Sequence, residues 1–276
     1  MPYLSSSATP KTEIYYEDSG GSGQPIVLIH GWPLSGRMWE AQINALTAAA
    51  FRCISYDRRG FGASGKPAGG YDYDTMTSDV HDLIEHLDLR NVVLAGFSMG
   101  GGEVCRYFGR YGGAGVAKAM LISAVPPFLL KTADNPDGVP KELLDGILKG
   151  VTSDRINFLG GFLQKFFNLD KKKNAISDEL LQYNKTIAWQ ASPIATQECV
   201  KAFSASDFRS DMKKMNVPTL VLHGDSDQIV PFEVSGKRSA AMLPQSRLEV
   251  IKGAPHGLAA THAEELSTLM LDFLRS

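Results

Sequence analysis

The sequence has few cysteines, little excess of charge and no long apolar run. Its 276 residues include three cysteines, which are scattered and form no CxxC pair. An odd number of cysteines without such spacing argues against both a disulfide framework and a zinc site. No run of about 18 apolar residues could cross a membrane, and the N-terminus lacks a cationic start followed by an apolar segment. We therefore expect a cytoplasmic protein without a membrane partner.

The charges of the chain nearly balance. Lys and Arg number 28 against 30 Asp and Glu, so the formal net charge is −2. Without a basic excess, the sequence does not predict a nucleic-acid partner. A small neutral molecule is the expected partner, and the sequence leaves open whether the chain forms a homo-oligomer. A chain of this length buries about three quarters of its unfolded surface, which favours one large core with an inserted subdomain.

Short apolar runs that end in turn residues alternate with helical patterns. We predict buried strands in 24–31, 51–57, 91–96, 117–124, 217–225 and 246–254, and helices in 38–50, 75–89 and 263–275. This alternation predicts an α/β fold with a mostly parallel central sheet and helices on both faces. The segment 126–215 has helical patterns and no predicted strand. We therefore expect a helical cap, 126–215, inserted into a core formed by 1–125 and 216–276.

One serine lies in a G-x-S-x-G turn, Gly96-Phe97-Ser98-Met99-Gly100, between a predicted strand and a predicted helix. Such a turn strains the serine backbone and exposes Oγ, and it needs glycines where a Cβ would collide. The N–H of Met99 begins the helix, where free amides and the helix dipole favour an oxyanion. Ser98 is therefore the candidate nucleophile. A P-loop is disfavoured because no G-K-[ST] follows, and an ordinary turn with an incidental serine is the alternative.

A nucleophilic serine needs a base and an acid that orients the base. His256 directly follows a predicted strand, so we expect it on a loop at the sheet edge that carries Ser98. Asp225 and Asp227 both follow the strand before it. Asp225 occupies a Gly-Asp turn, where it is expected to bind local amides, whereas Asp227 lies further along the loop and can reach His256. We predict Asp227 as the acid, with Asp225 as the alternative.

These motifs resemble the α/β-hydrolase fold family, and more closely its cofactor-free haloperoxidase and aryl-esterase branch. The matching segments cover nearly the whole chain: HGWP from His30, YDRRGFGASGKP from Tyr56, DLIEHLDL from Asp82, GFSMGGGE from Gly96, TLVLHGDSDQIVPFE from Thr219 and APHGLAATHAEEL from Ala254. The order Ser98, Asp227, His256 is the order of the triad in that fold.

The resemblance also implies further site residues. It assigns the oxyanion hole to the backbone N–H groups of Trp32 and Met99. It implies a cap over an apolar acyl pocket, with Phe203, Ile229 and Val230 as lining residues, although core packing is an equally good interpretation of Phe203. Arg58 and Arg59, in the DRRG segment, are expected to brace the backbone rather than to bind an anion.

The family implies a serine hydrolase that cleaves small aryl or short-acyl esters through an acyl-enzyme, without a metal or another cofactor. Hydrogen peroxide in place of water would give a peracid, which oxidises halide. A haloalkane dehalogenase or an epoxide hydrolase would need aspartate in place of Ser98. A hydroxynitrile lyase usually has a pocket lysine, and the sequence identifies none. A lactonase, a C–C hydrolase and a catalytically weak ligand receptor remain as alternatives.

Pro33 directly follows Trp32 in the HGWP segment. Proline restricts the residue before it, so we expect Pro33 to hold the Trp32 carbonyl in one direction, whether the bond between them is cis or trans. A carbonyl that points into the site could accept a hydrogen bond from peroxide and favour it over water, so we count Pro33 among the substrate-binding residues. Members of the family described as haloperoxidases tend to carry proline here. The alternative is that Pro33 only stiffens the loop.

Overall fold

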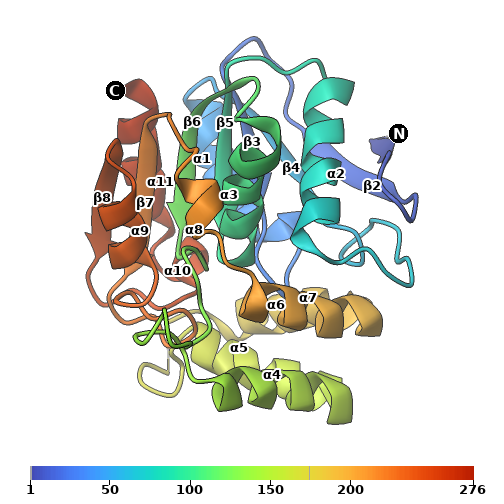
Figure 1. Cartoon of the computed structure of the whole chain (residues 1–276), viewed down its shortest axis with the longest axis vertical. Coiled ribbons are helices and arrows are strands. Elements are labelled where there is room, and N and C mark those ends of the chain that lie inside the picture. The colour runs from blue at the N-terminus through green and yellow to red at the C-terminus, as the bar shows by residue number, and fades with distance from the viewer. Residues whose placement is uncertain (1, 174) are drawn as a thin grey trace.

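A twisted sheet forms the centre of the molecule. The computed structural model describes residues 2–173 and 175–276, and within them eight strands pair in the order β1-β2-β4-β3-β5-β6-β7-β8 (Figure 1). The strands are β1 (Tyr3–Ser5), β2 (Glu13–Asp18), β3 (Pro25–Ile29), β4 (Arg52–Tyr56), β5 (Val92–Phe97), β6 (Val116–Ile122), β7 (Thr219–Gly224) and β8 (Ser246–Ile251). In the order of the sheet, every neighbouring pair from β4 through β3 to β8 is parallel. β2 is antiparallel to both of its neighbours, β1 and β4.

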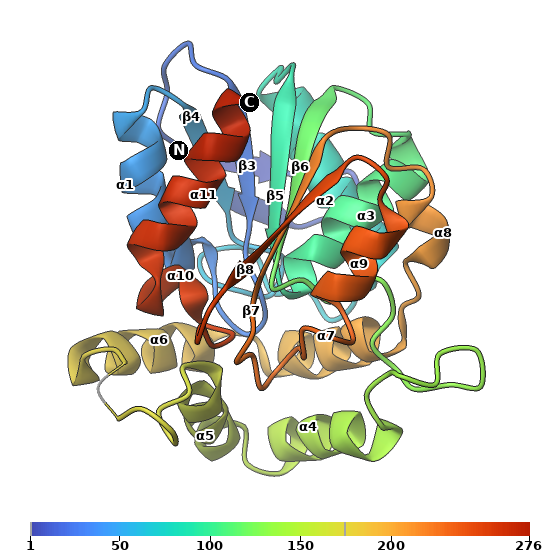
Figure 2. The same ribbon diagram turned by 90° about the vertical axis from the view of Figure 1, so that its left-hand side faces the viewer.

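Helices cover both faces of this sheet. They are α1 (Glu40–Ala48), α2 (Tyr73–His86), α3 (Met99–Tyr111), α4 (Lys141–Ser153), α5 (Arg155–Phe166), α6 (Asp178–Gln190), α7 (Pro193–Ala205), α8 (Arg209–Met212), α9 (Gly236–Met242), α10 (Leu258–Thr261) and α11 (Ala263–Arg275), with a 3-10 turn at Gly36–Trp39. Figure 2 shows α1 and α11 on one face, and α2, α3 and α9 on the other. The central strand β5 is fully buried, as expected for a strand covered on both faces.

The predicted fold class is confirmed, and each predicted strand and helix is present with shifts of a few residues at its ends. The strands β1 and β2 were not predicted. β1 has only three residues, and β2 has charged residues at both ends and is mostly half-buried. Neither therefore forms the apolar run from which the other strands were predicted.

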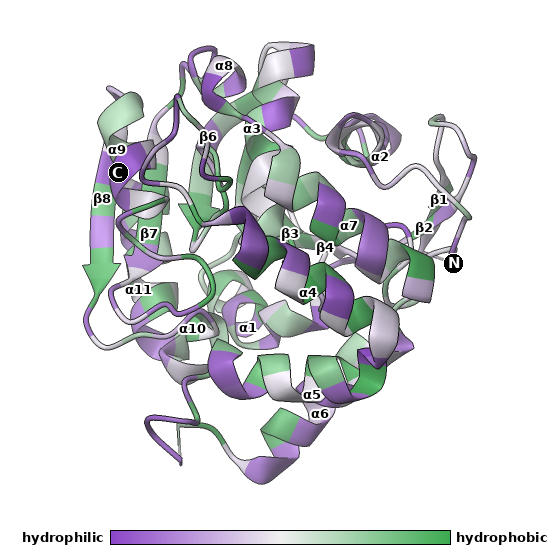
Figure 3. Cartoon of the chain, turned by 60° about the horizontal axis from the view of Figure 1, so that its bottom comes forward, coloured by the Kyte–Doolittle hydropathy of each residue, from purple (hydrophilic) through white to green (hydrophobic). Residues whose placement is uncertain are grey.

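The helices α4 to α7 lie beyond the carboxyl ends of the parallel strands, at the bottom of Figure 1. Seen from that end, they carry both hydrophobic and hydrophilic residues (Figure 3), as is typical of helices with one packed face. The short helix α8 packs instead against α3. No helix in the described ranges is long and apolar enough to span a bilayer.

A buried ion pair ties together three segments around the carboxyl ends of β3, β4 and β5. Arg58 Nε and Nη2 each donate to a carboxylate oxygen of Glu103 at 2.7 Å, and both side chains are fully buried. Nη2 also donates to the His30 carbonyl at 2.6 Å, and the Arg58 N–H donates to His30 Nε2 at 2.9 Å. The neighbouring Arg59 pairs with Asp79 at 2.6 Å. Both arginines therefore have the bracing role expected of them.

Replacing Glu103 with alanine would leave the Arg58 guanidinium buried without its partner. We expect Glu103→Ala to lower the free energy of unfolding by about 3–5 kcal/mol, measured by urea denaturation. Glu85→Ala is the control, because its pair with Arg90 is exposed and should contribute less than about 1 kcal/mol. Equal effects of the two substitutions would contradict this account.

Candidate active site

Ser98 occupies a strained turn between β5 and α3. Its φ of 53° and ψ of −118° lie in a region that residues with a Cβ rarely adopt. The surrounding backbone holds this conformation: the Ser98 N–H donates to the Ile122 carbonyl at 2.9 Å, and the Ser98 carbonyl accepts from the N–H groups of Gly101 and Val125 at 3.1 Å each. The turn therefore fixes the direction of Oγ before any substrate binds.

The two glycines of the motif allow the helix to start against the sheet. A Cβ on Gly96 would lie 2.4 Å from the Gly100 carbonyl oxygen, and a Cβ on Gly100 would lie 2.5 Å from the Ile29 carbonyl oxygen. Both clashes are with backbone atoms, so no side-chain rotation could relieve them. This is the close approach that the sequence motif predicts.

The structure brings Ser98, His256 and Asp227 into one hydrogen-bonded series. His256 Nε2 lies 2.9 Å from Ser98 Oγ, and His256 Nδ1 lies 2.6 Å from Asp227 Oδ2. All three side chains are buried. The other carboxylate oxygen of Asp227 accepts from the N–H groups of Ile229 and Val230, each at 2.8 Å. The carboxylate is therefore fixed on one side by its own loop and on the other by the imidazole.

A second histidine supports Asp227. His223 Nε2 lies 2.8 Å from the Val230 carbonyl oxygen and 3.3 Å from Asp227 Oδ2. Burial alone would raise the pKa of Asp227, but the charge of His256 and the hydrogen bonds from His223 and His256 hold that pKa well below its usual range. The stability that this carboxylate contributes is present above its unfolded-state value of about 3.9 and is lost as the pH falls through the lower folded-state pKa.

The contact of His223 with Asp227 was not predicted from the sequence. Asp225 accepts from the Gly253 N–H at 2.6 Å and from Ser226 Oγ at 3.1 Å. Its amide partner therefore lies in the turn after β8 and not in its own loop, where the sequence predicted it.

Trp32 and Met99, whose backbone N–H groups are predicted to form the oxyanion hole, both line the cavity at Ser98. Neither N–H donates a hydrogen bond to another protein group within residues 2–173 and 175–276. The Trp32 side chain is held by its indole N–H, which donates to the Thr196 carbonyl at 3.2 Å. The bond between Trp32 and Pro33 is cis.

A small apolar cavity, here called the inner cavity, surrounds Ser98 and has a volume of about 30 Å³. Its lining residues are Trp32, Ser98, Met99, Val125, Leu129, Leu144, Ile147, Phe162, Phe203, Ile229 and Val230. The three residues predicted for the acyl pocket, Phe203, Ile229 and Val230, are therefore in place. Pro33, also predicted to contact substrate, is buried and is not among the lining residues. Sequence reasoning missed Leu144, Ile147 and Phe162, which come from α4 and α5.

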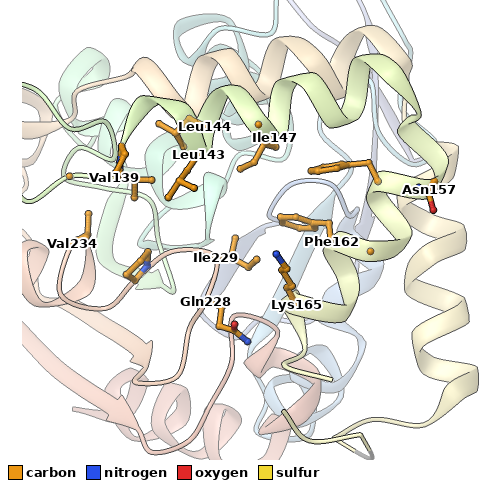
Figure 4. Close-up of a pocket in the computed structure, with 16 residues that line it drawn as sticks. Val139, Leu143, Leu144, Ile147, Asn157, Phe162, Lys165, Gln228, Ile229 and Val234 are labelled. Atoms are coloured by element: carbon orange, nitrogen blue, oxygen red, sulfur yellow. The ribbon is translucent and has the colours of Figure 1, made fainter. Parts of the chain in front are cut away.

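A larger cavity, here called the outer cavity, lies between α4, α5 and the loop that follows β7 (Figure 4) and has a volume of about 720 Å³. Four side chains line both cavities: Leu144, Ile147, Phe162 and Ile229. The outer cavity also contains Lys165. The sequence did not identify this pocket lysine, and no lysine lines the inner cavity.

In the described part of the chain, no group of three or more His, Cys, Asp or Glu side chains is arranged to hold a metal ion. The site therefore consists of a buried hydroxyl, an imidazole, a carboxylate and two backbone donors around an apolar space. This donor set suits acyl transfer from an ester-like carbonyl to the serine.

A family model described as the alpha/beta hydrolase fold matches residues 24–263. The chain belongs to the α/β-hydrolase family. The solved structure of a bromoperoxidase from Bacillus anthracis is 49% identical to it, with a TM-score of 0.95 over 99% of this chain and 100% of that chain. A non-heme chloroperoxidase, CPO-A1, from Kitasatospora aureofaciens is 42% identical over 95% of this chain and 96% of its own length.

A third relative of this α/β-hydrolase is a bifunctional esterase/perhydrolase, DCH, from Acinetobacter calcoaceticus, which is 38% identical over 96% of each chain. The resemblance to the haloperoxidase and esterase branch of the family is therefore confirmed. These similarities extend over almost the full length of each relative.

The two aspartates of the β7 loop should differ sharply in their effect on activity. In this α/β-hydrolase, Asp227→Asn should lower kcat for p-nitrophenyl acetate by roughly 10⁴, because an amide favours the wrong histidine tautomer. Asp225→Asn is the matched control, and it should alter stability more than kcat because Asp225 binds only its own loop and the turn after β8. A large loss in Asp225→Asn with little loss in Asp227→Asn would assign the acid to Asp225.

Proposed function

We propose that this chain is a serine hydrolase that cleaves esters of small carboxylic acids, including aryl esters, through an acyl-enzyme on Ser98. The observation that carries this proposal is the hydrogen-bonded series Ser98–His256–Asp227, which lies beside two unpaired backbone N–H groups. The relatives named as haloperoxidases and as an esterase/perhydrolase support it. The expected partner is a small ester or carboxylic acid.

The geometry suggests the following course of the reaction. His256 Nε2 takes the proton from Ser98 Oγ as Oγ attacks the ester carbonyl carbon, while Asp227 holds the Nδ1–H and stabilises the imidazolium. The N–H groups of Trp32 and Met99 bind the negative oxygen of the tetrahedral intermediate. His256 then gives its proton to the leaving alcohol oxygen. Water attacks the acyl carbon with His256 again as base. As the bond between the acyl carbon and Oγ breaks, His256 returns the proton to Ser98 Oγ and the carboxylic acid leaves.

The inner cavity favours short acyl groups. Its volume of about 30 Å³ is far below the roughly 720 Å³ of the outer cavity. A short acyl group therefore fits beside Ser98 with less movement of the lining side chains than a long one. Apart from Ser98, the lining side chains belong to hydrophobic residues, so they suit an alkyl group rather than a polar one.

Hydrogen peroxide can take the place of water in the second half of this reaction. Its oxygen attacks the acyl carbon, His256 accepts its proton, and the product is a peracid that oxidises halide away from the enzyme. We assign the choice between peroxide and water to the Trp32 carbonyl, whose direction is restricted by Pro33. Pro33 would then act through its neighbour, in keeping with its absence from the cavity wall.

We also propose that 126–215 serves as a cap for this site. Its helices α4 and α5 supply Leu144, Ile147 and Phe162 to the inner cavity, and α7 supplies Phe203. Because α8 packs against α3, the last part of this segment belongs with the core rather than with the cap. The functional cap would therefore end near the end of α7.

If Ser98 carries the acyl group, Ser98→Ala should lower kcat for p-nitrophenyl acetate by several orders of magnitude, on the order of 10⁶ when a triad serine is removed. The reason is that no other group at the site can accept the acyl group. Ser204→Ala is the matched control, since Ser204 is on α7 and lines neither cavity. Retention of a tenth of the activity by Ser98→Ala would rule out the proposal.

Replacing Pro33 should change the choice of nucleophile. We expect Pro33→Leu to lower the rate of peracetic acid formation from acetate and hydrogen peroxide, relative to hydrolysis of p-nitrophenyl acetate, because leucine does not restrict Trp32 as proline does. Both rates are measured on the same preparation of wild type and variant. An unchanged ratio would show that Pro33 only stiffens the loop.

A further inference from the structure

The two cavities differ greatly in size, which limits where each part of an ester can bind. The inner cavity, of about 30 Å³, is much smaller than the outer cavity, of about 720 Å³. The two share Leu144, Ile147, Phe162 and Ile229 as lining residues, so they adjoin each other. With a short acyl group beside Ser98, the outer cavity is the larger space next to it for the alcohol part of the ester.

The outer cavity is apolar with one charged residue. Most of its lining residues are hydrophobic, glycine or proline; of the described residues that line it, Lys165 alone is charged, and Asn157 and Gln228 are the neutral polar ones. The amide nitrogen of Gln228 already donates to Asn168 Oδ1 at 2.6 Å and to Asp170 Oδ1 at 3.2 Å. Gln228 therefore has no free donor for a ligand.

Lys165 differs from Gln228 in this respect. It lies in the last turn of α5, and within the described ranges no carboxylate comes within the 4 Å of an ion pair. Figure 4 shows its nitrogen pointing into the cavity, toward Ile229. A lysine in the last turn of a helix interacts favourably with the helix dipole whichever way its side chain points. The position of Lys165 therefore does not explain why its side chain faces the cavity.

We propose that Lys165 binds a carboxylate on the alcohol part of the substrate, so that the enzyme prefers short-acyl esters of phenols or alcohols that carry a negative charge. This inference rests on the proposed ester hydrolysis at Ser98 and names its substrate class. The reaction at Ser98 is unchanged: the acyl group is transferred to Oγ, and a hydroxy acid leaves with its carboxylate still ionised.

The charge of Lys165 favours such a pair. A carboxylate is the group that complements an unpaired ammonium. Lys165 is exposed, so water screens part of this attraction, while the apolar lining of the cavity contacts the rest of the alcohol part. A neutral aryl ester would still bind through the apolar walls but would leave the ammonium without a partner. The gain is expected mainly in KM, because the carboxylate contacts Lys165 equally in the ground state and in the transition state.

The test compares charged and neutral esters of the same shape. The probes are 4-acetoxybenzoate and (4-acetoxyphenyl)acetate, which place the carboxylate at two distances from the ester, each paired with its own methyl ester. For wild type we expect a higher kcat/KM for the acid than for its methyl ester in at least one pair. Lys165→Met should lower that ratio by about two- to fivefold, as expected for loss of an exposed ion pair, and mainly through KM.

Two further variants show whether charge is the cause. Lys149→Met removes an exposed lysine of α4 that does not line the outer cavity, and it should leave the ratio unchanged. Lys165→Glu should reverse the selectivity, so that the cationic ester 4-(aminomethyl)phenyl acetate becomes a better substrate than either of the two carboxylate esters. Urea denaturation of each variant checks that a lower rate does not come from loss of folded protein.

The outcomes separate this inference from the proposed function. If wild type hydrolyses the methyl esters and Lys165→Met leaves the ratio unchanged in both pairs, the role of Lys165 is overturned while ester hydrolysis stands. If wild type hydrolyses none of the four esters, or Ser98→Ala hydrolyses them equally well, the proposed function itself fails. A ratio that falls equally in Lys149→Met would also overturn the role of Lys165.

Discussion

The close approach of α3 to the ends of β3 and β5 is the constraint on which the site depends. It requires that Gly96 and Gly100 have no Cβ, and it forces the backbone strain at Ser98. The same helix carries the N–H of Met99 in its first turn and Glu103 one turn later. Through Arg58, Glu103 holds the carbonyl of His30, two residues before Trp32. One helix thus places the serine and the N–H of Met99, and it anchors the loop that bears Trp32, the two residues proposed to bind the oxyanion.

The two side chains that complete the hydrogen-bonded series with Ser98 come from loops at the β8 end of the sheet. Asp227 follows β7 and His256 follows β8, which are adjacent parallel strands, so their loops leave the sheet side by side. The Asp227 carboxylate receives two backbone N–H groups and contacts two imidazoles. Those contacts offset the cost of burying its charge. The acid is therefore held rigidly, and the histidine between it and Ser98 has little freedom to turn away.

Local sequence predicts the parts of this site that depend on local geometry. The turn at Ser98 follows from two glycines and the strand–helix boundary, and the contact of Asp227 with His256 follows from its position further along the β7 loop. The contact of Asp225 with Gly253 joins two loops and was not predicted. The walls of the cavities follow less well. The amphipathic patterns of α4 and α5 indicate that each helix buries one face, but not which element it packs against. Leu144, Ile147, Phe162 and Lys165 were therefore not predicted, because their placement depends on packing between distant segments.

The side chains shared by the inner and outer cavities come mostly from outside the sheet. Leu144, Ile147 and Phe162 lie on α4 and α5, whereas Ser98, Asp227 and His256 lie at the ends of sheet strands. No hydrogen bond of the triad passes through these three apolar residues. Mutations in these residues can therefore change which esters are accepted without altering the acid–base chemistry. Relatives that share the same reacting residues can in this way differ in substrate specificity.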